Sequence, residues 1–543
     1  MRHLPIMKKS LMTLATGMIL VAMTASCPAA ETTPPPITLN SVVVTTSKQT
    51  TPLAQGVTIA GIPVLDQPAL LAKLNRHIGQ AITRESLQEL LAEINGQLAA
   101  AGETFSVASL PAQDISSGRL TVLVIRAHVG EVRVRNAGAG TFSDADYRRL
   151  LRLKPGDVLE ADTLEADVDW INRSNTYRNA QVMTQPGKEI GQTDVELLVT
   201  DRRPYGFSAS YDNNGTERTG QNRITLSSGW GKAFGTDQQL SYTLNANPNF
   251  ENYVAHSVSY VVPLPWRHLL SVSANYADIK SKMPEPFDSH GSNLGFSVRY
   301  DIPLKNVGRY SHGANLGFDF KRSDNNLLFS QTPVTNTLTK IYQLNAGYSG
   351  TLPDAHGATS VGINWVHSPG GVGHDNSDAA FDAARLGAVS KYDYQTLSLQ
   401  RQTRLPAEWL WQIDLRLQHS DANLLGSEQL SAGGVRSVRG FAEAIAFGDE
   451  GTLLRTELQS PAKPLGAGAR LQGVLFYDAA RLNNVHLLSG EAAANRLSSV
   501  GLGFRLNLPR QISVNVDAAK RLTVHVPGAT AAHLVHVSVA ASF

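Results

Sequence analysis

The feature that most constrains this fold is an alternation of apolar and polar side chains that runs through residues 205–543. One face of a single segment carries Trp409, Trp411, Ile413, Leu415 and Leu417. Polar residues such as Gln412, Asp414 and Arg416 stand between them. A period of two is that of a β-strand whose two faces meet different surroundings. No convincing helical spacing appears after residue 205, so this part of the chain is predicted to be all β.

Turn-forming residues divide this region into sixteen alternating segments. They begin near residues 205, 221, 238, 252, 268, 291, 309, 336, 357, 389, 408, 452, 468, 498, 511 and 533. The 339 residues from 205 to 543 allow about 21 residues for each strand and its connection, which suits an outer-membrane barrel. Lipid offers no hydrogen-bond partner to a sheet edge, so a sheet in a membrane must close. The predicted architecture is a 16-stranded antiparallel transmembrane β-barrel at residues 204–543.

The end of the chain separates this interpretation from a soluble β-sandwich or propeller, which also alternates. The last segment places on one face Val535, Val537, Val539, Ala541 and Phe543. An alternating strand that closes on a terminal aromatic residue is typical of outer-membrane barrels. We therefore favour the barrel and expect these residues to form its assembly signal.

A repeat of about 75 residues precedes the barrel. Residues 79–95 resemble residues 156–172, and both stretches place apolar residues at helical spacing. A β-branched run precedes each copy, and a hairpin-like pair of strands follows it, at 105–127 and 177–200. The sequence predicts two small α+β domains, at residues 57–128 and 129–203, each with the order strand, helix, helix, strand, strand.

The N-terminus predicts export. Basic residues precede an apolar stretch at 11–23, and small residues follow, which is the layout of a signal peptide at residues 1–30. The single cysteine, Cys27, excludes a structural disulfide and a cysteine-based zinc site within the chain. Cys27 either leaves with the signal peptide, remains as a free thiol or accepts a lipid. Residues 31–56, with three successive prolines at 34–36, are predicted to be an extended linker.

The longest connection before the last strands, residues 421–451, is rich in glycine. Its candidate loop motif is Gly433, Gly434, Val438, Arg439, Gly440 and Phe441. A phosphate-binding loop is disfavoured, because no strand-loop-helix context and no Lys-Ser/Thr pair accompany it.

The next clue is a carboxylate on a late strand. In residues 470–478 the alternation turns Phe476 and Asp478 toward the lumen, and a carboxylate inside a barrel wall needs a cation. Arg439 would supply a geometrically specific partner from the loop. The alternative is that Asp478 pairs with Arg470 or with Arg505, and the alternation of side chains alone does not decide among these partners.

These residues resemble known motifs. The sequence VRGF at 438–441 and F-x-D at 476–478 look like the signatures of 16-stranded barrels that carry POTRA domains. The sequence DNNG at 212–215 resembles the barrel opening in one branch, the outer-membrane transporters of two-partner secretion (TpsB, FhaC/ShlB-like). The resemblance covers residues 57–543. It departs from the pattern at Ala480, where a glycine is usual, and the prolines and valines of residues 31–56 disfavour the pore-plugging helix of many members.

The resemblance implies an outer-membrane transporter whose periplasmic POTRA domains bind an unfolded, secreted TpsA-like exoprotein and whose barrel passes it to the surface. It implies no enzyme activity, no cofactor, no metal and no nucleic acid. Partners would be the exoprotein, outer-membrane lipid and, during biogenesis, the barrel assembly machinery. Arg439 and Asp478 would hold the long loop inside the barrel.

Three other functions remain alternatives at this stage. A barrel assembly factor of the same superfamily typically carries more POTRA domains. A passive porin leaves the two-domain repeat without a role. A barrel enzyme needs a nucleophile beside a base, and neither G-x-S-x-G nor H-E-x-x-H occurs in the sequence.

Overall fold

A computed structural model describes residues 36–47, 55–329, 332–489, 493–526 and 534–543. The chain forms two compact units, residues 1–126 and 127–543, and each is described by itself. The expected signal peptide at 1–30 lies outside the described residues. Among the residues that are described, no helix has the length and apolar character needed to cross a membrane.

The first unit holds a small α+β domain. Its elements are β1 Ser41–Thr45, β2 Gly56–Ala60, α1 Pro68–Asn75, α2 Arg84–Ala100, β3 Val107–Ser109 and β4 Arg119–Ile125. The strands lie in the order β2-β1-β4-β3, with only β3 antiparallel to its neighbour. Helix α2 begins at a capping box between Thr83 and Ser86, and its apolar stripe of Leu90, Ile94 and Leu98 is buried against the sheet.

Strand β1 corrects the prediction that residues 31–56 form a linker. Within that range Ser41–Thr45 is an inner strand, paired in parallel with β2 on one side and β4 on the other. Val42 and Val44 are fully buried in the domain core. Three successive β-branched residues favour a strand, and burial of alternate side chains stabilises it. The proline-rich composition of the whole segment concealed this short run.

The second small domain follows the predicted order of elements. They are β5 His128–Asn136, α3 Asp144–Leu150, α4 Ala161–Ser174, β6 Arg178–Pro186 and β7 Gln192–Asp201. The sheet order is β5-β7-β6, with β5 parallel and β6 antiparallel to β7. Ser143 and Asp146 form a capping box at the start of α3.

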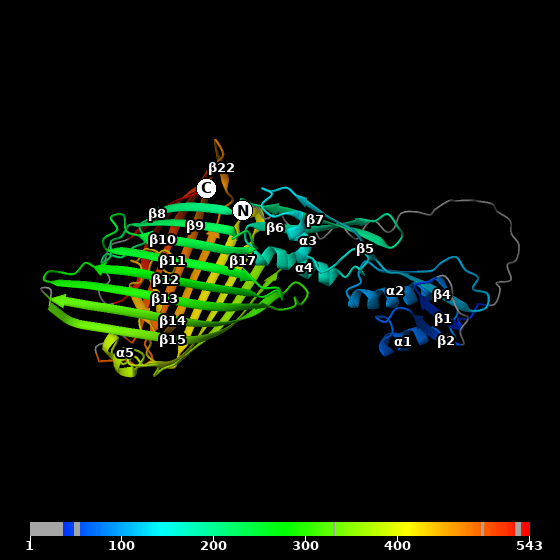
Figure 1. The fold of residues 1–543 in the computed structure, drawn as a ribbon, viewed down its shortest axis with the longest axis horizontal. Coiled ribbons are helices and arrows are strands. Elements are labelled where there is room, and N and C mark those ends of the chain that lie inside the picture. Colours follow the sequence, from blue (N-terminus) through cyan, green and yellow to red (C-terminus); the bar gives the residue numbers. More distant parts are fainter. Residues whose placement is uncertain (1–35, 48–54, 330–331, 490–492, 527–533) are drawn as a thin grey trace. The chain divides into compact units, whose positions relative to one another are not determined.

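Over the part of the chain that the structure describes, sixteen antiparallel strands close into a barrel (Figure 1). They are β8 Tyr205–Asp212, β9 Arg223–Ala233, β10 Gln238–Ala246, β11 Tyr253–Pro263, β12 Leu269–Ser281, β13 Phe287–Pro303, β14 Ser311–Phe329, β15 Thr332–Pro353, β16 Gly357–Pro369, β17 Lys391–Arg404, β18 Leu410–Ser420, β21 Glu450–Gln459, β23 Ala469–Asn483, β24 Asn495–Leu508, β25 Ile512–His525 and β26 Val535–Ser542. A short strand, β22 Lys463–Gly466, extends the turn before β23. The predicted fold class is confirmed.

The two faces of the wall match the alternation in the sequence. Large apolar side chains are exposed on the outside, among them Leu316, Leu344, Ile363, Leu502 and Phe504. Inward positions carry polar residues such as Asp319, whose carboxylate accepts hydrogen bonds from Gln343 and Asn345. An apolar belt around a polar interior is the arrangement that lipid requires.

One helix breaks the prediction that none follows residue 205. Helix α5, Asp378–Ala384, lies in the connection between β16 and β17 and is capped by Ser377. Its alanines favour a helix, and Phe381 is fully buried in a cluster with Tyr392 and Leu424. Seven residues give too few turns for a clear helical period in the sequence.

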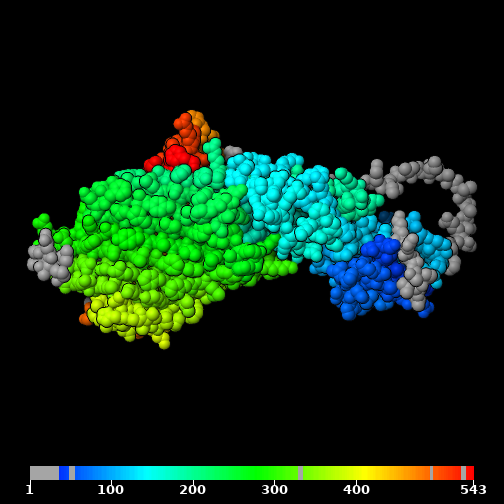
Figure 2. Space-filling model, in the orientation of Figure 1, coloured from blue at the N-terminus to red at the C-terminus, as the bar shows by residue number. Residues whose placement is uncertain are grey.

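The second small domain packs directly on one end of the barrel, which we call the short-turn end (Figure 2). Buried Arg178 is 2.8 Å from Asp237 in the β9–β10 turn, and Asn175 donates to the carbonyl of Gly231 at 2.7 Å. The ring of Tyr177 lies against Gly231, where a Cβ atom would come within 2.2 Å of it. The glycine therefore makes room for the docked domain.

Candidate functional site

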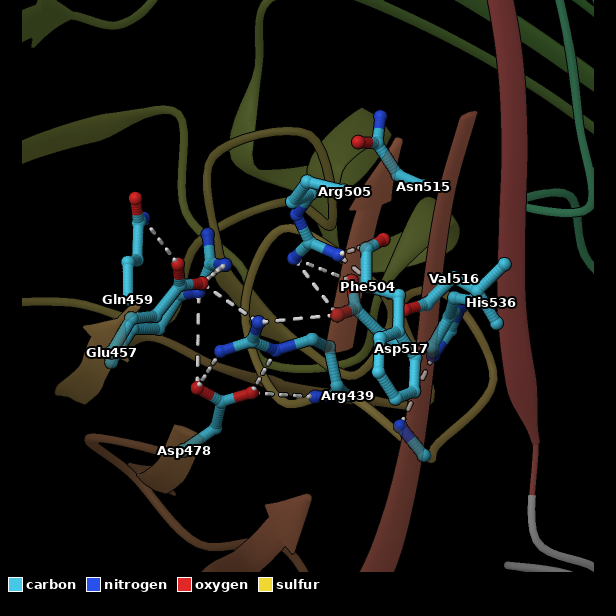
Figure 3. Close-up of polar contacts among 12 residues, drawn as sticks. Arg439, Glu457, Gln459, Asp478, Phe504, Arg505, Asn515, Val516, Asp517 and His536 are labelled. Atoms are coloured by element: carbon cyan, nitrogen blue, oxygen red, sulfur yellow. Dashed lines mark hydrogen bonds and ion pairs between the residues drawn. The ribbon is translucent and has the colours of Figure 1, made fainter. Parts of the chain in front are cut away.

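The long loop between β18 and β21, residues 421–449, lies inside the barrel against the wall formed by β21, β23 and β25 (Figure 3). It carries a two-stranded ribbon of β19, Leu430–Ala432, and β20, Ala446–Gly448. Val438 and Phe441 of the loop are fully buried and pack with Leu453 and Leu482 of the wall. The loop tip is therefore packed against the wall through a small apolar cluster to which both contribute.

Arg439 at the loop tip meets Asp478 on β23. Arg439 Nε lies 2.7 Å from Asp478 Oδ2, and Arg439 Nη2 lies 2.8 Å from Oδ1. The Arg439 backbone N–H donates to Oδ2 at 3.1 Å. Both side chains are fully buried. A bidentate pair with a third bond to the backbone specifies one orientation of the loop tip.

Four further charged side chains complete this site. Arg439 Nη1 is 2.7 Å from Glu457 Oε1 and 3.9 Å from Asp517 Oδ1. Arg455 binds Glu457 at 3.1 Å, and Arg505 binds Asp517 at 2.8 Å. The three arginines of the network, Arg439, Arg455 and Arg505, face three carboxylates. The charges therefore balance, as they must where burial weakens screening by water.

Phe476, the other residue of the F-x-D motif, packs its ring against the guanidinium of Arg439. The guanidinium carbon of Arg439 lies 3.5 Å from the centre of the Phe476 ring, a cation-π contact. The ring fills the space above Gly501 on β24, where a Cβ atom would stand 2.3 Å from it. The phenylalanine, the glycine and the arginine thus form one packed unit.

Gly440 brings the loop backbone into contact with β25. Its φ is +84°, and a Cβ atom would lie 2.7 Å from the Cβ of Ala519. The Gly440 carbonyl accepts a bond of 2.6 Å from Arg521, whose guanidinium also covers the Phe441 ring at 4.6 Å. Only glycine combines this conformation with this close approach.

The other predicted glycines shape the start of the same turn. Gly433 has a φ of +109°, and its N–H and carbonyl both bond to the hydroxyl of Ser437, at 2.9 and 2.8 Å. Gly434 has a φ of +92° and lies beneath the side chain of Glu443. These contacts make the loop tip compact.

A second buried carboxylate anchors the root of the loop. Asp449 is fully buried and accepts bonds from Nη1 and Nη2 of Arg385, at 2.6 and 3.1 Å. It also accepts bonds from the backbone N–H groups of Leu424 at 2.9 Å and Val485 at 3.2 Å. Arg385 directly follows α5, so one carboxylate joins three connections at the long-loop end of the barrel.

Of the pairings that the sequence left open, the structure contains Arg439 with Asp478, whereas Arg505 pairs with Asp517. Sequence reasoning missed Glu457, Asp517 and the Arg385–Asp449 pair as site residues. Glu457 and Asp517 stand at inward positions of β21 and β25, so the alternation of inward and outward side chains could have identified them as candidate site residues. Nothing in the sequence links Arg385 to Asp449, because only folding brings them together.

The remaining predicted residues lie where the alternation placed them. Val535, Val537 and Val539 are exposed on the outer face of β26, and Phe543 is 79% exposed. Ala541 pairs in register with Ile512 of β25. Ala480, which departs from the family pattern, packs into the apolar cluster of the loop.

Comparisons with known proteins agree with this architecture. The family model described as haemolysin secretion/activation protein ShlB/FhaC/HecB matches residues 191–506, and the ShlB-type POTRA domain matches residues 53–127. The heme/hemopexin transporter protein HuxB of Haemophilus influenzae is 24% identical over 476 residues, which cover 84% of this chain and 81% of HuxB. The hemolysin transporter protein ShlB of Serratia marcescens is 23% identical over 428 residues, covering 76% and 72%.

A solved structure shares the fold along nearly the whole chain. CdiB from Escherichia coli superposes with a TM-score of 0.77 at 20% sequence identity, over 96% of this chain and 93% of CdiB. Such a match covers the small domains and the barrel together.

Proposed function

This chain belongs to the haemolysin secretion/activation family ShlB/FhaC/HecB, and we propose that its buried Arg439–Asp478 pair holds the long loop in the position that secretion requires. The chain is an outer-membrane transporter of two-partner secretion, with POTRA domains in the periplasm. Membership of this family implies a secreted partner protein. The short-turn end of the barrel therefore faces the periplasm, and the long-loop end faces the outside.

The burial of the pair supports this role. Two fully buried, opposite charges are costly to separate, because the Asp478 carboxylate would lose its bidentate partner in a place without water, and Arg439 would retain only its bond to Glu457. Removal of one member of such a pair typically costs about 3–5 kcal/mol. The loop tip is therefore held strongly against the wall, although its backbone has no strand partner on β23. The pair positions the loop and leaves the wall hydrogen bonds unchanged.

The partner that we propose is an unfolded, TpsA-like exoprotein. Strands β2 and β3 are the two edges of the first POTRA sheet, and an extended chain can add to such an edge through its backbone. HuxB and ShlB are named as transporters of heme/hemopexin and of hemolysin, so we infer a large exported protein of this general kind. The exposed residues of β26 would meet the assembly machinery during insertion and lipid afterwards. We assign the chain no catalytic reaction.

Replacement of Arg439 tests the proposed role of the loop. In Arg439→Ala we expect export of the partner to fall at least tenfold, while the barrel still inserts, because the wall keeps its ladder of hydrogen bonds. Asp478→Ala should give the same result. Export is measured by quantifying the partner in the culture supernatant, and insertion by the folded band of the unheated protein on a denaturing gel.

The matched control is Arg470→Ala, since Arg470 is an exposed arginine on the same strand as Asp478. It should leave export unchanged. Normal export by Arg439→Ala would show that the pair has no role in secretion.

A further inference from the structure

The lumen of the barrel has two unlike halves. Beneath the long loop, inward side chains of the wall are buried, as Asp478 on β23 and Asp517 on β25 show. Strand β12 stands eight places from β23 in either direction around the ring of sixteen wall strands, so it lies on the opposite wall. There the inward residues Ser257 and Asn275 are exposed. The loop therefore occupies one half of the lumen and leaves the other half open.

Five successive strands, β9 to β13, form this open wall, and Figure 1 shows them side by side. The register joins in one row around the barrel Ser227, Thr243, Ser257, Asn275 and Gly295. The even-numbered residues beside this row include exposed apolar side chains of the outer face, such as Tyr242, Val258 and Phe296. Since successive side chains of a strand alternate between faces, the odd-numbered residues face the lumen.

We call this surface the neutral face and define it as the odd-numbered residues of 225–229, 241–245, 255–259, 271–277 and 293–297. Each of them is Ser, Thr, Asn, Gly or Ala, so the face has no charge and no large side chain. The next residue of the row, Lys321 on β14, is charged and binds Glu428 of the long loop at 2.6 Å. Among the described residues, no hydrogen bond or ion pair joins the long loop to the neutral face itself.

A wall of small hydroxyl and amide groups suits the passage of an unfolded chain. Ser, Thr and Asn both donate and accept, so they exchange hydrogen bonds between water and a passing backbone at little net free energy. An apolar wall would bind the apolar side chains that an unfolded chain exposes. A charged wall would retain residues of opposite charge and repel those of like charge. The neutral face does neither, so it admits chains of any sequence.

We propose that the exported partner crosses the barrel in extended form along the neutral face of β9–β13. This inference rests on the proposed export of an unfolded exoprotein and adds the surface that the chain contacts on its way. The small side chains of the face and the position of the long loop on the opposite wall leave this half of the lumen to the passing chain. Passage along it does not require the Arg439–Asp478 pair to separate.

Photo-crosslinking inside the barrel tests this path. The partner is the secreted protein that is lost from a strain without this chain, and a disulfide-closed domain fused to its C-terminus stops it in the barrel. The photoreactive residue p-benzoylphenylalanine replaces Ser273 on the neutral face, Gln472 at an inward position of the opposite strand β23, or Ala274 on the lipid side of β12. We expect the yield of crosslinks to the stalled partner from Ser273 to exceed the yields from the other two positions roughly fivefold.

Narrowing the open half of the lumen supplies a second measurement. Ser259 and Ser273 are direct register partners, and tryptophan at both positions would fill space that the exported chain uses. We expect export by the double variant Ser259→Trp/Ser273→Trp to fall roughly fivefold. The matched control is Val258→Trp/Ala274→Trp, the adjacent pair of the same ladder, whose exposed side chains face lipid. It should leave export unchanged, and the folded band of the unheated protein reports insertion of both variants.

Equal crosslinking from Ser273 and Gln472 would overturn the proposal, as would normal export by the inserted variant with tryptophan at 259 and 273. Should the two inward tryptophans prevent insertion, the crosslinking yields decide by themselves. A partner that depends on this chain but crosslinks equally from both walls contradicts only the path along the neutral face. A strain without this chain that loses no secreted protein would contradict the proposed export as well, so the two failures are distinguishable.

Discussion

At the scale of single residues, Arg439 is distinguished by the number of groups that it joins. Its guanidinium meets Asp478 and Glu457 directly and covers the ring of Phe476. A lysine at this position would keep the charge but lose the planar, forked geometry that permits a bidentate bond. Geometry and charge can therefore be separated by experiment.

For Arg439→Lys we expect export between that of the native protein and that of Arg439→Ala, roughly three- to tenfold below native. The reason is that one ammonium group cannot reproduce both bonds to Asp478 and the stacking on Phe476. Arg470→Lys is the matched control, because Arg470 is an exposed arginine on the same strand as Asp478. Equal export by the two lysine variants would show that charge alone is sufficient at position 439.

At the scale of elements, the root of the long loop depends on α5 and on the residue that follows it. Arg385→Ala would leave Asp449 buried with its charge no longer paired. We expect the loop root to loosen, so that extracellular protease added to whole cells cuts within residues 421–449 at least five times faster. Arg416→Ala, at a weakly paired arginine on β18, should not change the rate. A protease pattern identical to that of the native protein would contradict an anchoring role for Arg385.

Helix α3 of the second POTRA domain supplies a prediction about pH. Burial alone would raise the pKa of the Asp146 carboxyl, but hydrogen bonds from Ser143 and Lys232 outweigh it and lower this pKa from 3.8 to about 2. The folded pKa lies below the unfolded one, so the contribution of Asp146 to stability is complete above about pH 4 and is lost as the pH falls through 2.

The melting temperature of full-length Asp146→Asn in detergent should therefore be below that of the native protein by the same amount at pH 7 and pH 5. The difference should shrink as the pH approaches 2. A difference that disappears already at pH 5 would show that the carboxyl does not keep its low pKa in the docked domain.

At the scale of the whole molecule, family membership predicts dependence on one partner. A strain without this chain should lose one large secreted or surface protein, while its other outer-membrane barrels stay at normal levels. Mass spectrometry of the culture supernatant and of the outer membrane measures both. Broad loss of other barrels would mean an assembly factor, and no change in either fraction would favour a porin.

The amount of structure that could be read from the sequence differed between these scales. The starts of the sixteen barrel strands lie within about four residues of the predicted positions, because a period of two is visible wherever lipid and water face opposite sides of one strand. Strand β1 and helix α5 were missed, since five and seven residues are too few to show a period. Their formation depends on burial of Val42, Val44 and Phe381, which is a tertiary effect.

The sequence by itself determined the barrel, the two α+β domains, the inward direction of Asp478 and the family resemblance, because each of these follows from a local pattern or a short motif. Only the tertiary structure decided which arginine pairs with Asp478 and that Arg385 secures Asp449. Arg385 and Asp449 stand 64 positions apart in the chain. Contacts between such distant residues depend on closure and register of the sheet, which no local pattern encodes.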